Sequence, residues 1–107
     1  MLAFNDAINA QDLAGLVRLM SPDHRFVDSA EQVVQGRAAC RRAWASFFES
    51  FPDYRNVFNS IGVVEDGHVV ADGRSECASP ALHGAARWHA TVAGDLIVEW
   101  RVEVTDA

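Results

Sequence analysis

Asp28 is the side chain of this 107-residue sequence that is best placed for acid–base chemistry. It follows two apolar residues, Phe26 and Val27, in a short run that predicts a strand entering the core. Burial of a carboxylate at the mouth of an apolar cavity disfavours its charged form, which makes it a usable general base near neutral pH. The plainer alternative is a loop carboxylate in water. The residues around Asp28 leave both open.

Large aromatic side chains could line such a cavity. Apolar residues recur at helical spacing over residues 37–51, and they alternate with polar residues over 87–104 as they do in strands. Buried indole rings pack in a core or line a ligand pocket, and each N–H needs a partner there. We therefore expect a pocket for a small, largely apolar ligand, with a wall formed by Trp44, Phe48, Trp88 and Trp100.

Charged residues occupy every second position from Asp72 to Glu76. Side chains two residues apart share one face of a strand, so Asp72, Arg74 and Glu76 form either a solvated outer face or a buried acid–arginine–acid relay. Arg74 and Glu76 are for that reason candidate substrate-binding residues. His89 falls opposite Glu99 in the expected strand pairing, and the simplest interpretation of these two residues is a surface pair.

Metal-dependent and cofactor-dependent chemistry have no recognisable motif in the sequence. The four histidines lack the short spacings of metal ligands, and no cysteine pair stands near them. Glycine-rich phosphate and dinucleotide motifs and the nucleophile elbow are also missing. Cys40 lies on an apolar helix stripe, and both Cys40 and Cys77 are expected to be reduced thiols. We therefore expect no metal and no cofactor.

Composition limits the partners and the location. Nine arginines, with no lysine, stand against 15 aspartates and glutamates, so the net charge is -6. This balance argues against nucleic acid or an anionic membrane surface as the main partner, because both need a basic patch. No apolar run approaches the roughly 18 residues of a membrane span, and the N-terminus does not have the pattern of a signal peptide. These features predict a single domain, 1–107, in the cytoplasm.

Three helical segments are expected in the first half of the chain. The first carries apolar residues at helical spacing from Phe4 to Ile8. Asp12 can cap the second, whose apolar stripe is expected to reach Met20 before the break at Ser21-Pro22. The third is the amphipathic stretch over residues 37–51.

After Pro52 apolar and polar residues alternate, which predicts a four-strand antiparallel meander. Asp66-Gly67 suits a two-residue turn, and this turn pairs Val64 with Val69. Together with one early strand, these elements predict an α+β fold. Because strands of about ten residues are long for so small a domain, we expect the mostly antiparallel sheet to curve around the three helical segments.

The residue pattern of the final hairpin restricts the length of its loop. Its two strands keep their apolar residues on one face only if the loop has three residues, Ala93-Gly94-Asp95. This loop pairs Trp88 with Trp100 and needs a positive φ at Gly94. A two-residue loop would instead set Trp88 opposite Glu99.

Short motifs along almost the whole chain resemble those of one family in their order and spacing. They are Asn9-Ala10-Gln11-Asp12-Leu13, the strand ending in Asp28, Gly36-Arg37, Phe51-Pro52-Asp53, Asp66-Gly67 and Leu96-Ile97-Val98-Glu99-Trp100-Arg101. Together they are similar to the SnoaL-like branch of the nuclear transport factor 2-like superfamily. The resemblance implies a cone-shaped α+β barrel around an apolar pocket, and a homodimer formed through the outer surface of the sheet.

The same family includes ketosteroid isomerases, limonene-type epoxide hydrolases and polyketide cyclases. Asp28 matches the position of the isomerase's catalytic base, whereas Phe4 and Trp88 stand where that enzyme has its two oxyanion-hole groups. Arg74-Ser75-Glu76 resembles the Arg-x-Asp of the hydrolases, but Val102 stands where they have a further acid. The resemblance thus implies cofactor-free isomerase, cyclase or hydrolase chemistry with Asp28 as base. The alternative is a domain of the same fold that only binds a ligand or dimerises.

Overall fold

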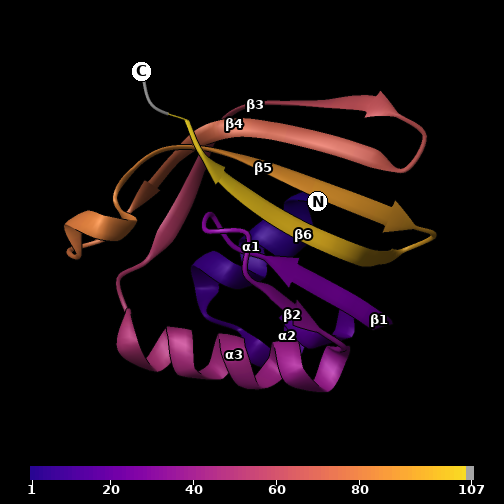
Figure 1. Cartoon of the computed structure of the whole chain (residues 1–107), viewed down its shortest axis with the longest axis horizontal. Coiled ribbons are helices and arrows are strands. Elements are labelled where there is room, and N and C mark those ends of the chain that lie inside the picture. Colours follow the sequence, from indigo (N-terminus) through magenta and orange to yellow (C-terminus); the bar gives the residue numbers. More distant parts are fainter. Residues whose placement is uncertain (106–107) are drawn as a thin grey trace.

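Three α-helices lie along one face of a curled six-stranded sheet in residues 1–105, the part of the chain that the computed structural model describes (Figure 1). The helices are α1 (Leu2–Ala10), α2 (Leu13–Arg18) and α3 (Arg37–Ser50), with a short 3₁₀ helix, η1 (Pro80–Leu82). The strands are β1 (Met20–Val27), β2 (Val33–Gln35), β3 (Arg55–Glu65), β4 (His68–Glu76), β5 (Gly84–Ala93) and β6 (Leu96–Val104).

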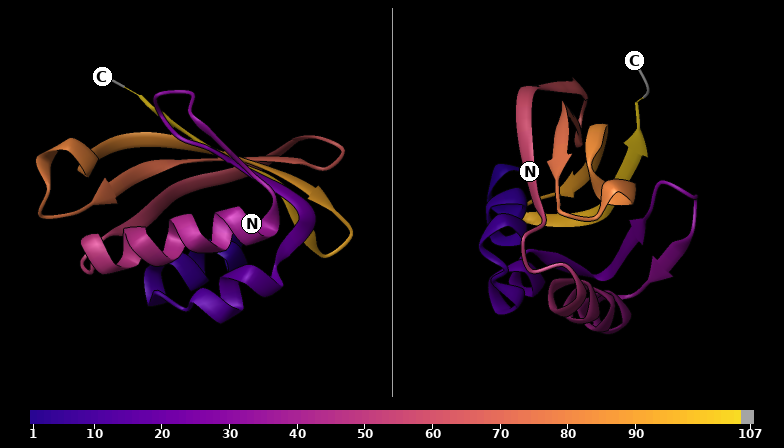
Figure 2. Two further views of the ribbon diagram at one scale, coloured as in Figure 1. Left: turned by 60° about the horizontal axis from the view of Figure 1, so that its bottom comes forward. Right: turned by 90° about the vertical axis from the view of Figure 1, so that its left-hand side faces the viewer.

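The strand order in the sheet is β2-β1-β6-β5-β4-β3. Strands β3 to β6 form the antiparallel meander that the alternation predicts. β1 pairs parallel to β6 at the edge of this meander, and β2 pairs antiparallel to β1. The sheet curls over the helices without closing, so the prediction of a cone-like α+β fold is confirmed (Figure 2).

Local signals explain where α2 begins, but its predicted end is wrong. Asp12 caps the helix, since its carboxylate accepts a hydrogen bond at 3.0 Å from the backbone N–H three residues further on. The helix ends before Met20, because the Leu19 carbonyl accepts a hydrogen bond at 2.7 Å from the N–H of Ile97 in β6. The predicted break at Ser21-Pro22 lies inside β1, where the pairing with β6 is irregular. Tertiary hydrogen bonds here override the helical spacing of the apolar residues.

The β3–β4 hairpin has the predicted two-residue turn at Asp66-Gly67, with Gly67 at a φ of 73°. Its predicted register is wrong by one residue, because β3 contains a bulge next to the turn. Val69 therefore lies opposite Val63 and not opposite Val64. The bulge leaves Val64 exposed instead of placing it on the inner face with Val69.

The prediction of a three-residue loop in the final hairpin is also wrong. The loop has two residues, and Gly94 takes the expected positive φ, at 61°. One extra residue in β6, Val98, then shifts the pairing so that Trp88 lies opposite Val102 and not opposite Trp100. A longer loop was expected to keep the apolar residues of both strands on one face. The bulge in β6 has this effect instead, because it adds one residue to the strand.

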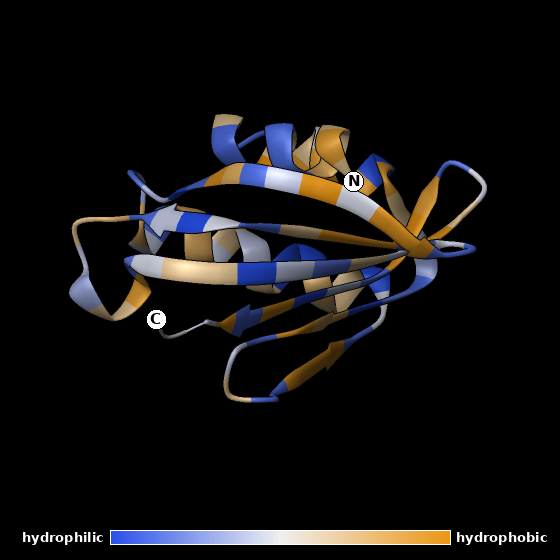
Figure 3. Ribbon diagram, turned by 90° about the horizontal axis from the view of Figure 1, so that it is seen from above, coloured by the Kyte–Doolittle hydropathy of each residue, from blue (hydrophilic) through white to orange (hydrophobic). Residues whose placement is uncertain are grey.

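The core lies between the inner face of the sheet and the helices. Trp88 and Trp100 from the sheet meet Phe4 and Ile8 of α1 and Trp44 of α3, and all five are buried. Polar and apolar segments alternate along the strands when the sheet is seen from above (Figure 3). Within residues 1–105, no helix is both long enough and apolar enough to cross a bilayer.

Candidate functional site

A cavity of about 390 Å³, which we call the aromatic cavity, lies between α3 and the inner face of the sheet. Besides tryptophan rings, its wall contains the apolar side chains of Phe26, Val34, Ala43, Phe47, Leu82 and Val102. The polar side chains in the wall come from Asp28, Ser29 and Tyr54. A concave, mostly apolar wall with a few polar groups suits a small apolar molecule held in one orientation.

The structure brings Trp44, Trp88 and Trp100 together in this wall. They are the three tryptophans of the sequence, and they come from α3, β5 and β6. Phe48, the fourth aromatic residue expected there, lies in the core with its ring 5.6 Å from that of Trp44. Phe47, one residue earlier in α3, takes its place in the wall.

Asp28 follows the last residue of β1 and is half-buried in the cavity wall. Its Oδ1 accepts hydrogen bonds from the backbone N–H groups of Ala30 and Gln32, both at 2.9 Å. The backbone N–H of Asp28 donates to the Gln32 carbonyl at 3.0 Å, so the turn between β1 and β2 holds the carboxylate in place. Within residues 1–105, Oδ2 has no hydrogen-bond partner. Oδ1 therefore stabilises the turn, whereas Oδ2 forms no hydrogen bond with the described residues.

Arg74 and Glu76 lie apart from the aromatic cavity. Strand alternation puts Ala71 and Ser75 of β4 inside, and it puts Arg74 and Glu76 on the outer face. There the two side chains form an ion pair, with Arg74 Nη2 2.9 Å from Glu76 Oε2, and both are partly exposed. Asp72 also lies on the outer face and pairs with Arg87 at 2.7 Å, so this row of charges is solvated and does not form a buried relay.

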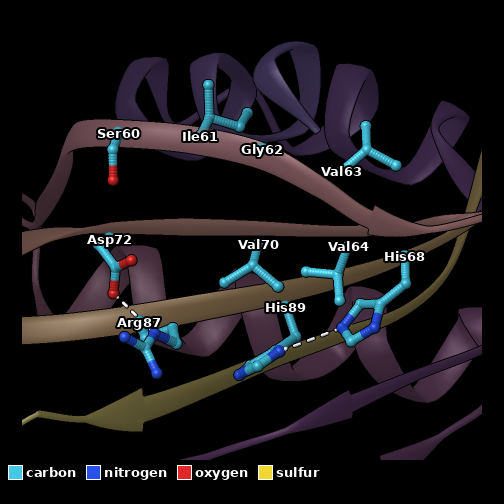
Figure 4. A pocket seen from close by; sticks show the side chains of 10 residues that line it. All are labelled: Ser60, Ile61, Gly62, Val63, Val64, His68, Val70, Asp72, Arg87 and His89. Carbon is cyan, nitrogen blue, oxygen red and sulfur yellow. Dashed lines mark hydrogen bonds and ion pairs between the residues drawn. The ribbon is translucent and has the colours of Figure 1, made fainter.

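The outer face carries a second, open hollow of about 570 Å³, which we call the outer hollow (Figure 4). In it His89 Nδ1 lies 3.2 Å from His68 Nε2, and His89 Nε2 lies 3.3 Å from a Glu103 carboxylate oxygen. The predicted pair between His89 and Glu99 is therefore wrong, because the bulge in β6 places Arg101 opposite His89.

Tyr54 is a residue of the cavity wall that the sequence patterns did not single out. Its hydroxyl oxygen lies 3.1 Å from Ser75 Oγ, and burial raises the pKa of the Tyr54 phenol above its ordinary value of 10.0. The available signal was strand alternation, since Tyr54 stands two residues before the buried Asn56 and so shares its face.

The described part of the chain holds neither a reactive thiol at Cys40 nor a metal-binding cluster. Cys40 is buried with its Sγ 3.4 Å from the Val34 carbonyl oxygen, and burial raises the pKa of its thiol, which disfavours the reactive thiolate. Cys40 and Cys77 are both free thiols. Residues 1–105 contain no cluster of three or more histidine, cysteine, aspartate or glutamate side chains that could hold a metal ion. The titratable residues in the wall of the aromatic cavity are Asp28 and Tyr54.

A family model described as a SnoaL-like domain matches residues 1–105. No curated protein sequence shows a significant match to the chain. Among solved structures, the chain is similar to a candidate polyketide cyclase from Sinorhizobium meliloti, with a TM-score of 0.84 and 17% identity over 94% of this chain and 90% of the other.

Two further solved structures have the same fold. A candidate SnoaL-like polyketide cyclase from Jannaschia sp. CCS1 has a TM-score of 0.78 and 23% identity, covering 94% of this chain and 79% of its own. A candidate ketosteroid isomerase from Kribbella flavida DSM 17836 has a TM-score of 0.79 and 14% identity, covering 99% of this chain and 75% of its own. At such identities the likeness shows the fold alone.

Proposed function

Because the chain belongs to the SnoaL-like domain family, we propose that it binds a small, largely apolar molecule in the aromatic cavity and that Asp28 acts on this molecule as a general base. The observation that carries the proposal is the position of Asp28 in the cavity wall, which is made otherwise mostly of aromatic and aliphatic side chains. Two of the similar structures are candidate cyclases and one is a candidate isomerase, and both activities fall in the proposed class of chemistry.

The proposed step is the removal of a weakly acidic proton from the bound molecule by Asp28 Oδ2. The two N–H groups that hold Oδ1 fix the orientation of the carboxylate, so the base needs no reorganisation when the ligand arrives. The same oxygen can return the proton to another atom, which gives an isomerisation or a ring closure without a cofactor. A single positioned base typically contributes about 10²- to 10⁴-fold in rate.

A second function is favoured by one observation. The hydrogen bonds from Ala30 and Gln32 give the Asp28 carboxylate a structural role that does not require chemistry. The alternative proposal is therefore a domain that binds the same class of apolar molecule and does not transform it.

Tetralone, a bicyclic ketone with acidic C–H bonds beside its carbonyl, can test the binding step. All three tryptophans lie in the cavity wall, so bound tetralone should quench the intrinsic fluorescence. Ala43→Leu adds volume inside the wall and should weaken binding by about tenfold or more. Ala38→Leu, at an exposed position of the same helix, is the matched control and should bind as the natural protein does. Equal binding by both variants would contradict the cavity as the site.

Asp28→Asn tests the chemical step. The amide oxygen can still accept the two turn N–H bonds, whereas the basic carboxylate is lost. The exchange of tetralone's acidic protons with deuterium, followed by NMR, should be catalysed by the natural protein and should fall to the uncatalysed rate in the variant. Tetralone affinity should stay unchanged. Exchange that persists in Asp28→Asn would remove Asp28 as the base, and binding without any catalysed exchange in the natural protein would favour the binding-only function.

We also propose that a second copy of the chain covers the outer face of the sheet. The helices lie on the other face, and Val64 beside the outer hollow is 64% exposed. Acidic and basic side chains alternate across this face, as at Asp72 and Arg87, so a twofold copy can meet its own complement. A stable pair should bury more than about 1,000 Å² in total. Sedimentation velocity should give a dimer for the natural protein and a monomer for Val64→Arg, whereas Val33→Arg, on β2 at the opposite edge of the sheet, should stay dimeric. A monomeric natural protein would contradict this proposal.

A further inference from the structure

A chain of polar side chains runs from the aromatic cavity into the core. The Tyr54 hydroxyl contacts Ser75 Oγ at 3.1 Å, and Ser75 Oγ contacts Asn56 Oδ1 at 3.2 Å. Asn56 Nδ2 then donates to Asn5 Oδ1 at 3.1 Å, which connects β4 and β3 to α1. Ser75, Asn56 and Asn5 are almost completely buried, so each of their hydrogen bonds must come from within the protein.

The direction of these hydrogen bonds follows from the groups at the inner end. Asn5 Nδ2 faces the backbone carbonyl of Asn56 at 3.5 Å, and a carbonyl can only accept. Asn5 Oδ1 therefore faces the Asn56 side chain, and the NH₂ group of Asn56 donates a hydrogen bond to it. The Oδ1 atom of Asn56 therefore faces Ser75. Because this oxygen can only accept, the Ser75 hydroxyl donates its one proton to it.

The direction of the hydrogen bond between Tyr54 and Ser75 follows in the same way. Since the proton of Ser75 is committed to Asn56, the short contact between Tyr54 and Ser75 requires Tyr54 to donate. Burial raises the pKa of Tyr54, so the phenol keeps its proton at neutral pH and has one to donate. Once that proton points to Ser75, the phenol oxygen has only lone pairs left.

We infer that Tyr54 acts toward the cavity as a hydrogen-bond acceptor, and that the ligand is an apolar molecule carrying a hydroxyl or N–H donor that meets the Tyr54 oxygen. This inference rests on the proposed function, because it names a feature of the molecule that the aromatic cavity binds. A ligand carbonyl or ether at the same place would face a lone pair and lose its hydrogen bond from water without a replacement. Tyr54 is in this sense a specificity-determining residue, and Asp28 acts elsewhere on the same ligand.

Ring-substituted tetralones test the inference without altering the ketone on which Asp28 would act. For each ring position, the hydroxyl, methyl and fluoro derivatives are compared by isothermal titration calorimetry. The methyl group matches the hydroxyl in size, and fluorine cannot donate. At the position that reaches Tyr54, the hydroxyl compound should bind about 3- to 10-fold more tightly than its methyl and fluoro partners, the value of one hydrogen bond. If no hydroxyl compound binds more tightly than its partners, the inference is wrong.

Tyr54→Phe should remove this advantage and leave the affinity of the methyl compound unchanged. An advantage of the hydroxyl compound that survives in Tyr54→Phe would assign the contact to another residue and overturn the inference. If Tyr54→Phe does not fold, equal binding of the hydroxyl and fluoro compounds by the natural protein would still overturn the inference. Failure of every tetralone to bind would contradict the proposed function itself, whereas equal binding by the three derivatives at every position would contradict only the role of Tyr54.

Discussion

His24 Nδ1 lies 2.6 Å from the carbonyl oxygen of Ile97, in the fully buried core. The contact falls where β1 and β6 depart from regular pairing, because the register of β1 shifts here and β6 contains the extra residue Val98. Since a carbonyl can only accept, Nδ1 carries a proton and donates a hydrogen bond to Ile97. Its Nε2 is buried and has no hydrogen-bond partner in residues 1–105.

This buried ring should make the stability of the protein depend on pH. Burial lowers the pKa of His24 below its ordinary value of 6.5, although the Ile97 carbonyl and the charges of Asp23 and Glu99 oppose the shift. The unfolded chain therefore binds a proton at a higher pH than the folded chain does. The free energy of unfolding should be insensitive to His24 above about pH 6.5 and should fall as the pH drops toward the lower folded pKa, by at most about 1.4 kcal/mol per pH unit. Urea unfolding at a series of pH values measures this slope.

Two asparagine variants separate His24 from the other histidines. His24→Asn keeps a donor near the place of Nδ1 and does not titrate, so it should flatten the slope below pH 6.5. His83→Asn changes an exposed histidine and should leave the slope as it is. A slope that is the same in His24→Asn and in the natural protein would show that other groups cause the acid sensitivity.

Asn9 should be important for attaching α1 to the sheet. Its side chain accepts a hydrogen bond from the Asn56 N–H at 2.7 Å and donates one to the Asn56 carbonyl at 2.8 Å. Asn9→Ala removes both and leaves a buried N–H without a partner, so it should cost about 2–3 kcal/mol of unfolding free energy in urea titrations. Asn59→Ala, at an exposed position of β3, should change stability by no more than about 0.5 kcal/mol. Similar effects of the two variants would contradict the role of Asn9.

Gly73 should be required for the close approach of β3 and β4. A Cβ atom at Gly73 would overlap the backbone carbonyl oxygen of Val57, and backbone atoms cannot move aside cheaply. Gly73→Ala should therefore cost about 3 kcal/mol or more in the same urea titrations. Gly62, on the neighbouring strand, has no atom within 4 Å of the place a Cβ would take, so Gly62→Ala should be neutral or slightly stabilising. A mild effect of Gly73→Ala would mean that the two strands can separate easily.

The parts of the fold that depend on hydropathy period could be predicted from the sequence. The helix after Gly36 and the four-strand meander follow from apolar spacing alone, because burial of one face fixes which residues lie inside. The registers could not be predicted, since Val98 and the residue beside the Asp66-Gly67 turn are single-residue bulges that nothing in the local pattern marks. In the final hairpin the apolar face survived the error, because β5 and β6 still bury Trp88 and Trp100. In β3 it did not, because the bulge leaves Val64 exposed.

The candidate site also contains some residues that periodicity could predict and others that it could not. Trp44 and Trp100 reach the cavity wall from positions that periodicity places inside. Strand alternation could place Tyr54 inside, but its role could not be predicted, because that role comes from a contact with Ser75, 21 residues away. The network that follows joins Asn56 to Asn5, 51 residues away, and no spacing rule connects such positions. The face of β4 that lies inside could not be predicted either. It depends on the pairing with β5, which places Arg74 on the outer face.

The structural and chemical roles of Asp28 can be separated by comparing two substitutions. Asp28→Ala removes the acceptor for the N–H groups of Ala30 and Gln32 and should cost about 1–2 kcal/mol of unfolding free energy. Asp28→Asn keeps an oxygen in the same position and should cost less than about 0.5 kcal/mol. Urea titrations of both variants therefore measure the turn, while deuterium exchange of tetralone measures the base. If the carboxylate serves only the turn, Asp28→Asn will match the natural protein in both measurements. If it is also the base, Asp28→Asn will keep the stability of the natural protein and lose the exchange.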